Sequence, residues 1–109
     1  VLLAALDDAE RDAIIEATPL VRHTDRTITD KDALREELRR IREAGYCILD
    51  QELEPSLRSI AVPVRSERGE VVAAVNISTN AGRISVDELI ERFLPVLQRC
   101  AEAIRPFMV

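Results

Sequence analysis

Three side chains in this sequence are candidates for nucleophilic or acid–base chemistry: His23, Cys47 and Ser59. His23 is the only histidine, so a catalytic pair would have to join it to the Cys47 thiol or to the Ser59 hydroxyl. A single histidine in a polar stretch is more typical of a solvated residue. The sequence contains no glycine-rich phosphate loop, no paired-histidine metal motif, no nucleophile elbow and no Cys-x-x-Cys pair. A small hydrolase is therefore kept only as an alternative.

Acidic residues cluster at Asp50, Glu52 and Glu54, and clustered carboxylates can bind a metal ion. Alternating acids in a connector are more typical of a solvated loop, so we expect neither a metal ion nor an organic cofactor. The whole chain has a net charge of −5, whereas binding to duplex DNA requires a surplus of Lys and Arg on one face. We therefore expect no DNA contact from these residues themselves.

The most informative pattern is a β-hairpin, predicted over residues 57–65 and 70–79 around the loop 66–69. With a symmetric loop, Arg65 pairs with Glu70 and Ser59 lies opposite Asn76. One face is then apolar and must be covered, most simply by helices; it carries Ile60, Val62, Val64, Val71, Ala73, Val75 and Ile77. The other face is small and weakly polar; it carries Ser59, Ala61, Pro63, Val72, Ala74, Asn76 and Ser78.

Short side chains leave room above this second face, and Ser59, Asn76 and Ser78 bring hydrogen-bonding groups to it. Room together with convergent polar groups favours a ligand pocket. The alternative is that these three side chains bond to one another or to nearby backbone beneath a packed helix. The residues alone leave both interpretations open.

The segments before the hairpin predict two helices and a short strand. Asp7 and Glu10 form a capping pattern for a helix that ends at residues 18–19 and has Ile14 and Ala17 on one face. Residues 20–29 are expected to be an extended connection. Apolar residues at positions 34, 38 and 41 then predict a helix that begins at Thr29 or Asp30 and ends at Gly45, followed by a strand over residues 46–49.

After the hairpin, Ser85 and Glu88 predict the start of a last helix that runs to the end of the chain, with a kink at Pro95. The elements together predict an α+β fold. With 109 residues, 47% of them hydrophobic, the chain fits one small domain with a single core.

The compartment follows from the cysteines and the chain start. Two cysteines are too few for a disulfide framework, no signal-peptide pattern is present, and no apolar run approaches the roughly 18–20 residues of a membrane span. We therefore expect a cytoplasmic protein with no membrane partner. The chain begins with Val1 rather than Met, which we interpret as a start inside a domain.

Several spaced segments carry a family resemblance. They are Gly45-Tyr46, residues 50–54 (DQELE), residues 57–65 (LRSIAVPVR) and residues 69–79 (GEVVAAVNIST). With residues 2–6, 27–29 and 93–95 they span nearly the whole chain. The chain resembles the IclR family of bacterial transcription regulators, and most of all the branch that controls aromatic-acid catabolism through the β-ketoadipate pathway.

The resemblance implies the effector-binding domain of a one-component regulator, with a GAF-like antiparallel sheet and flanking helices. Residues 1–109 would be the C-terminal part of that domain, without the N-terminal DNA-binding winged helix-turn-helix and without the domain's first strands. Family members bind small organic acids above the sheet, and the matching positions are Leu49, Ser59, Asn76 and Ser78. Some relatives carry an acidic residue in place of Leu49, so the resemblance implies a more apolar or aromatic acid here.

We therefore predict a domain that senses a small organic or aromatic acid, performs no reaction on it, and alters how a separate DNA-binding module docks. A homo-oligomer, either a dimer or a tetramer, is expected because a small sheet leaves unpaired edges. One alternative from another class is a plain oligomerisation domain, whose small-residue face packs on a second subunit.

Overall fold

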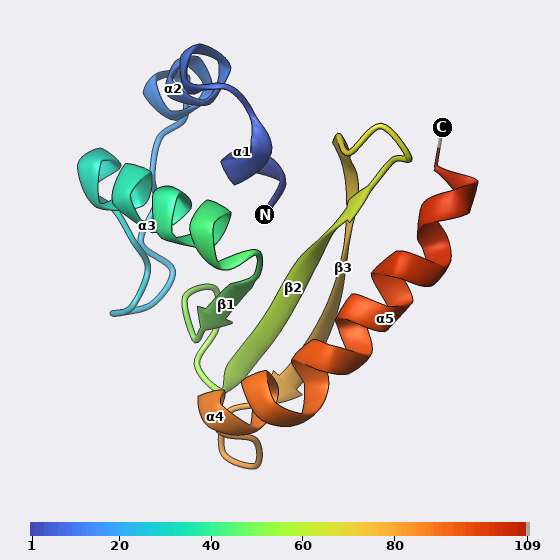
Figure 1. Cartoon of the computed structure of the whole chain (residues 1–109). Helices are drawn as coiled ribbons and strands as arrows, with labels where there is room; N and C mark the ends of the chain where they lie inside the picture. The colour runs from blue at the N-terminus through green and yellow to red at the C-terminus, as the bar shows by residue number, and fades with distance from the viewer. Residues whose placement is uncertain (109) are drawn as a thin grey trace.

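The computed structural model describes residues 1–108, in which three strands form one antiparallel sheet in the order β1-β2-β3 (Figure 1). The strands are β1 (Cys47–Asp50), β2 (Leu57–Arg65) and β3 (Val71–Asn80). Their limits agree with the sequence prediction to within one residue. Helices flank the sheet on both sides, so the predicted α+β class with an antiparallel sheet and flanking helices is confirmed.

The predicted register of the hairpin is wrong by two positions. Ser59 lies opposite Ser78 rather than Asn76, and Asn76 lies opposite Ala61. One position of the shift comes from the loop, which closes through a hydrogen bond from the Ser66 backbone N–H to the Glu70 carbonyl at 2.8 Å and so holds five residues rather than four. The second position comes from a β-bulge that places one extra residue in β3.

Side chains alternate between the two faces of a strand, so a register shift of two residues leaves each side chain on its predicted face. Beyond the bulge the predicted faces are therefore correct. Ile60, Val62 and Val64 are buried on one face, where Ala73, Val75 and Ile77 lie beside them. Val71 precedes the bulge and is the exception. It pairs with Arg65 on the opposite face, which corrects its predicted place in the apolar core.

Three helices precede the sheet: α1 (Leu2–Ala5), α2 (Asp8–Ala17) and α3 (Lys31–Ala44). The predicted cap of α2 is confirmed, since the Asp7 carboxylate accepts from the Glu10 N–H at 2.9 Å. The Asp30 carboxylate caps α3 in the same way, accepting from the Ala33 N–H at 2.8 Å. Gly45 ends α3 in the left-handed conformation, with φ of 82°. The short α1 was not predicted.

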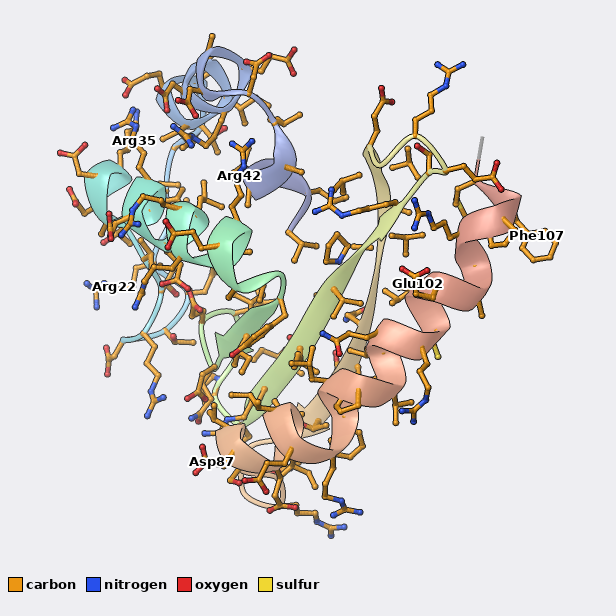
Figure 2. The ribbon with its side chains drawn as sticks, in the orientation of Figure 1. Arg22, Arg35, Arg42, Asp87, Glu102 and Phe107 are labelled. Atoms are coloured by element: carbon orange, nitrogen blue, oxygen red, sulfur yellow. The ribbon has the colours of Figure 1, made fainter. Side chains whose placement is uncertain are left out.

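The buried face of α2 differs from the sequence prediction. Ile15 is buried, whereas Ile14 is 46% exposed. Arg35 of α3 lies on the side of that helix toward α2 (Figure 2). There it contacts the carboxylates of Asp12 and Glu16. These ion pairs lie outside the buried cluster and fix how the two helices face each other.

The last helix consists of four segments: α4 (Val86–Glu88), the π-helix η1 (Leu89–Phe93), α5 (Leu94–Ile104) and the 3-10 turn η2 (Arg105–Phe107). Ser85 caps it as predicted, accepting from the Glu88 N–H at 3.1 Å. Pro95 has no N–H to donate, and the irregularity that the sequence predicted as a kink takes the form of the π-helix that ends two residues before it, at Phe93.

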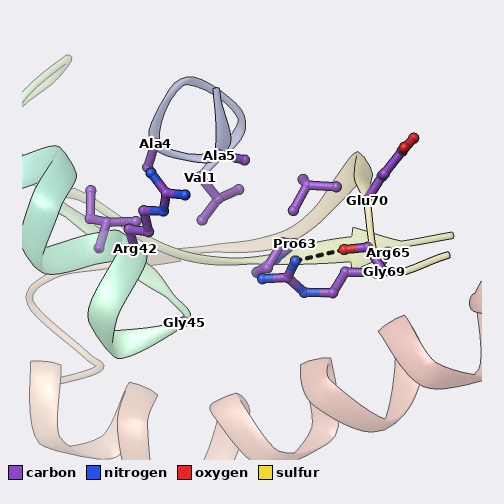
Figure 3. Close-up of a pocket in the computed structure, with 11 residues that line it drawn as sticks. Val1, Ala4, Ala5, Arg42, Gly45, Pro63, Arg65, Gly69 and Glu70 are labelled. Atoms are coloured by element: carbon purple, nitrogen blue, oxygen red, sulfur yellow. Dashed lines mark hydrogen bonds between the residues drawn. The ribbon is translucent and has the colours of Figure 1, made fainter. Parts of the chain in front are cut away.

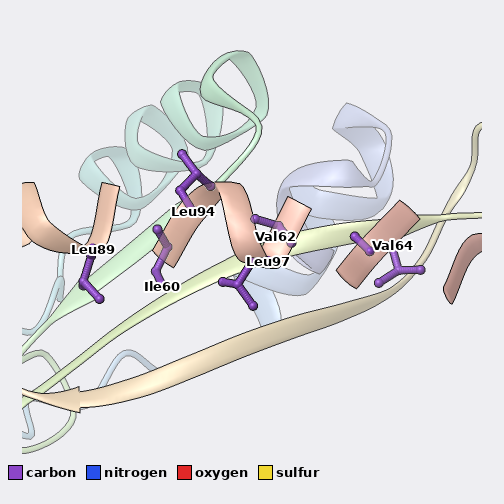
Figure 4. Packing of buried hydrophobic residues seen from close by; sticks show 7 residues of the cluster. Ile60, Val62, Val64, Leu89, Leu94 and Leu97 are labelled. Carbon is purple, nitrogen blue, oxygen red and sulfur yellow. The ribbon is translucent and has the colours of Figure 1, made fainter. Parts of the chain in front are cut away.

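Two clusters of buried side chains lie on the two sides of the sheet, where the sequence predicted a single core. The larger joins the sheet to α5, with Leu89, Leu94 and Leu97 packed on Ile60 and Val62 (Figure 4). The smaller joins α1, α2 and α3; it is made of Ala4, Ile15, Leu38 and Ile41. No helix among residues 1–108 combines the length and hydropathy that crossing a membrane requires.

Candidate functional site

The four residues predicted to bind an effector lie on one face of the sheet, away from α5. Leu49 of β1 pairs with Ser59 of β2, which pairs with Ser78 of β3, so these three side chains form one row across the sheet. Asn76 lies in the next row, beside Ala61 and Cys47. Strands distant in sequence therefore bring the four side chains together, although the predicted pairing of Ser59 with Asn76 was wrong.

This face, which we call the acid face, consists of Leu49, Ser59, Asn76 and Ser78. Asn76 and Ser78 are exposed, Ser59 is half-buried, and Leu49 is 47% exposed. Within residues 1–108 the two hydroxyls and the amide make no hydrogen bond to a protein group; those that the structure shows run between other side chains and backbone groups. Their hydrogen-bonding capacity is thus free for water or a ligand.

A cavity lies away from these four residues, at the hairpin end of the sheet (Figure 3). This cavity of about 260 Å³ is bounded by α1, the end of α3 and the tip of the hairpin, and its lining includes Arg42, Pro63, Arg65 and Val71. None of the four acid-face residues lines it. A shallower cleft of about 330 Å³ lies at the other end of β3 and includes Ser78.

A group of polar contacts centred on Arg58 and Asp50, which we call the clamp, lies at the end of the sheet, one residue along each strand from Leu49, Ser59 and Ser78. The Arg58 guanidinium donates to the Asp50 carboxylate at 2.9 Å and to the carbonyls of Ala81 and Ile84 at 3.2 and 2.7 Å. The Thr79 hydroxyl donates to the Arg58 carbonyl at 2.7 Å. The hydrogen bond from Arg58 is the main reason that the pKa of Asp50 is lowered. Asp50 is thus a paired carboxylate rather than the solvated loop residue that the sequence predicted.

The connection over residues 20–29 is tied to the same end of the sheet. Arg26 contacts the Asp50 carboxylate at 2.8 Å, and the Thr24 hydroxyl donates to the Gln51 carbonyl at 2.6 Å. Thr27 donates to the Glu52 carbonyl. Sequence reasoning missed this set of residues, because the path of an irregular connection has no periodic signal. A sequence signal that could have pointed to part of it is the opposite charge of Asp50 and Arg58, which stand at the two ends of the connector between adjacent predicted strands.

The candidate nucleophiles have little support in the structure. Burial raises the pKa of the Cys47 thiol, which disfavours the reactive thiolate. His23 is exposed on the connection, where its backbone N–H donates to the Thr27 hydroxyl at 3.1 Å. The arrangement therefore shows no histidine bonded to either candidate nucleophile among the residues described.

The acidic segment offers no metal centre. Among the described residues, no group of three or more His, Cys, Asp or Glu side chains is arranged to hold a metal ion. Asp50 faces two arginines, and burial raises the pKa of Glu52. Raising that pKa favours the uncharged acid, which is the weaker metal ligand.

Comparisons with known proteins give the family. Residues 1–105 match the family model described as "Bacterial transcriptional regulator IclR C-terminal". The chain is 44% identical over 97 residues to the Pca regulon regulatory protein of Pseudomonas putida, covering 89% of this chain and 33% of that protein. It is 37% identical over 105 residues to the p-hydroxybenzoate hydroxylase transcriptional activator of Acinetobacter baylyi, covering 96% and 39%.

Solved structures show the same fold. A transcriptional regulator from Rhodococcus superposes with a TM-score of 0.93 at 48% identity, over 96% of this chain and 43% of that one. The PobR inducer binding domain from Acinetobacter, solved as a double mutant with 3-hydroxy benzoic acid, gives a TM-score of 0.93 at 34% identity, over 98% and 61%. This chain spans about a third of the length of the curated relatives, which are transcriptional regulators. The chain belongs to the IclR C-terminal family of bacterial transcriptional regulators.

Proposed function

We propose that this chain is the acid-sensing part of a bacterial transcriptional regulator and that it binds a small organic or aromatic acid on the acid face. The observation that carries the proposal is the set of hydroxyl and amide groups of Ser59, Ser78 and Asn76, which have no partner within residues 1–108 and lie beside the exposed Leu49. A relative with this fold was solved with 3-hydroxy benzoic acid, which makes a hydroxybenzoate the first compound to test.

The groups on the acid face suit such a ligand. Hydroxyl and amide N–H groups donate to a carboxylate, and each bond to a charged acceptor contributes about 1.5–3 kcal/mol. Leu49 offers an apolar surface for the ring, and the short side chains of Ala61 and Ala74 leave space above the sheet. The face presents no Lys or Arg among its four residues, so recognition there depends on hydrogen bonds and shape.

The regulator would respond through a change in conformational or oligomeric equilibrium. Residues 1–109 would form the C-terminal part of the effector-binding domain, and a winged helix-turn-helix elsewhere in the regulator would contact the operator. The net charge of −5 supports this division, since it disfavours DNA binding by the chain itself. We propose a cytoplasmic homo-oligomer that performs no reaction on its effector.

Titration calorimetry with 3-hydroxybenzoate tests the binding site. We expect the full regulator to bind the acid and Asn76→Leu to weaken binding by about 5- to 150-fold, because the variant loses a hydrogen bond to the ligand. Arg42→Gln and Arg65→Gln, which change the cavity at the hairpin tip, should retain wild-type affinity. If the arginine variants lose binding and Asn76→Leu does not, the acid binds in the cavity and the acid face is the wrong site.

Two alternative functions have their own readouts. A hydrolase that used Cys47 or Ser59 with His23 would release a product, which chromatography would detect after incubation with an ester of the acid. A plain oligomerisation domain would gain no stability from the acid, whereas a binding domain gains RT ln(1 + [L]/Kd). A rise in melting temperature with 3-hydroxybenzoate concentration therefore supports sensing over scaffolding.

A further inference from the structure

We propose that Arg58 and Asp50 are positioning residues for effector recognition: their clamp sets the spacing of the strands that carry Leu49, Ser59 and Ser78. This inference rests on the function proposed above. It assigns a role in acid binding to two residues that do not themselves lie on the acid face.

The register places the clamp one residue from the acid face on every strand. Asp50, Arg58 and Thr79 form one row across the sheet, which we call the clamp row. The adjoining row, which we call the acid row, is Leu49, Ser59 and Ser78. Side chains alternate between the faces of a strand, so the two rows point to opposite faces while sharing peptide bonds. Any change in the strand spacing of the clamp row is therefore transmitted to the acid row.

In the clamp row, a side-chain hydrogen bond joins each pair of neighbouring strands in addition to the backbone hydrogen bonds of the sheet. Arg58 binds Asp50 of the neighbouring strand at 2.9 Å, and Thr79 on the other side binds the Arg58 carbonyl at 2.7 Å. The Arg58 side chain is only 13% exposed. A hydrogen-bonded ion pair that is largely removed from water is held more firmly than the exposed pairs of α3.

The same clamp anchors the two irregular segments at this end of the sheet. Arg58 binds the carbonyls of Ala81 and Ile84 in the connection between β3 and α4. Asp50 binds Arg26 of the connection before α3. Arg58 thus joins the β3–α4 connection to Asp50, and Asp50 joins Arg26, so the clamp links both connections to the strands that carry the acid face.

The loop between β1 and β2 shows why the sheet needs this support. Gln51 and Ser56 have φ of 60° and 70°, a left-handed conformation that non-glycine residues rarely adopt. β1 is only four residues long, lies on the edge of the sheet and leads directly into this loop. Without Arg58 and Asp50, a short edge strand next to a strained loop would hold Leu49 less firmly.

The test measures 3-hydroxybenzoate affinity of the full regulator and its Arg58→Gln, Arg58→Lys and Asp50→Asn variants. Arg35→Gln is the matched control, because Arg35, like Arg58, contacts three partners. For Arg35 these are carboxylates of α2 and α3, and they lie away from the sheet. All affinities are measured at a temperature where circular dichroism shows each variant folded. Amide chemical shifts of Ser59 and Ser78, recorded without ligand, report directly on the acid row.

We expect Arg58→Gln and Asp50→Asn to weaken binding by about 2- to 30-fold and to shift the Ser59 and Ser78 amide resonances. Arg58→Lys should restore part of the affinity, because a lysine keeps the charge but lacks the planar fork that reaches Asp50 and two carbonyls together. Arg35→Gln should lower the melting temperature and leave the affinity and these resonances unchanged.

Two outcomes would overturn the inference. If wild type binds, Asn76→Leu weakens binding, and the clamp variants bind like wild type, the clamp is structural only and the proposed function stands. If Asn76→Leu binds like wild type, or if wild type itself does not bind the acid, the proposed function fails and the positioning role fails with it.

Discussion

On the face of the sheet beneath α5, Ile60, Val62 and Val64 are at most 2% exposed, whereas on the opposite face Leu49 is 47% exposed and Asn76 and Ser78 are open. The same strands build both faces. The first face is closed by a helix whose Leu89, Leu94 and Leu97 side chains pack directly on it. The second keeps its hydroxyl and amide groups unpaired within the described residues.

The difference shows that burial and recognition are divided between alternate residues of the same strands. Burial of apolar area contributes about 25 cal/mol per Å², so the face beneath α5 supplies stability. The acid face buries little apolar area, so it contributes little to stability. Its free polar groups are instead suited to binding a ligand. Changes on the first face should therefore alter folding, and changes on the second should alter binding.

The largest effect is expected for Ile60→Ala. Ile60 is completely buried in the cluster beneath α5, so its truncation removes apolar contacts and leaves a cavity. We expect the free energy of unfolding, measured by urea denaturation, to fall by about 2–5 kcal/mol. Ser59→Ala, one residue away on the acid face, is the control and should change it by less than about 0.5 kcal/mol. Similar losses in both variants would contradict the division between faces.

The next test exchanges polarity between neighbouring residues of β3. Val75→Asn places an amide against the core cluster, so we expect a loss of about 1–3 kcal/mol of unfolding free energy beyond the loss of apolar contacts. Asn76→Leu should remain folded and lose acid affinity instead. Urea denaturation and calorimetry measured on both variants give the result; a harmless Val75→Asn would show that the faces are assigned wrongly.

A smaller effect on the free energy of unfolding is expected when the pH is lowered, because the Asp50 carboxylate then becomes protonated. Its pKa lies below the usual value of 3.8 in the folded protein, chiefly because Arg58 donates to the carboxylate. A carboxyl with a lowered folded pKa stabilises the fold above its unfolded pKa, and this stability is lost as pH falls through the folded value. We expect the unfolding free energy to fall more steeply for wild type than for Asp50→Asn between about pH 5 and pH 3. Parallel curves for the two proteins would show that the pair contributes nothing.

The smallest effect is expected for Ser66→Ala. The Ser66 hydroxyl is buried and has no hydrogen-bond partner among the described residues, while its carbonyl accepts from Arg105. Removing an unpaired buried hydroxyl should leave the unfolding free energy unchanged or raise it by up to about 1 kcal/mol. Thermal denaturation measures the change, and a clear loss of stability would mean that this hydroxyl has a partner.

Much of the fold was predictable because its signals are local. Asp7, Asp30 and Ser85 act as helix caps within three residues of their partners, and Gly45 ends α3 with a backbone conformation that glycine adopts readily. The two faces of the hairpin followed from the alternation of side chains along a strand. The family resemblance placed Leu49, Ser59, Asn76 and Ser78 together, and their roles in binding stay a prediction.

The sequence by itself determined the strands, the long helices and the division of the sheet into an apolar and a small-residue face, since each depends on neighbouring residues and on a period of two or about 3.6. Only the tertiary structure decided the register, because one extra loop residue and one bulged residue have no periodic signature. It alone joined Arg26, Asp50 and Arg58 into a clamp with the Ala81 and Ile84 carbonyls. These groups are distant along the chain, and their meeting depends on how the connections pack once the sheet has formed.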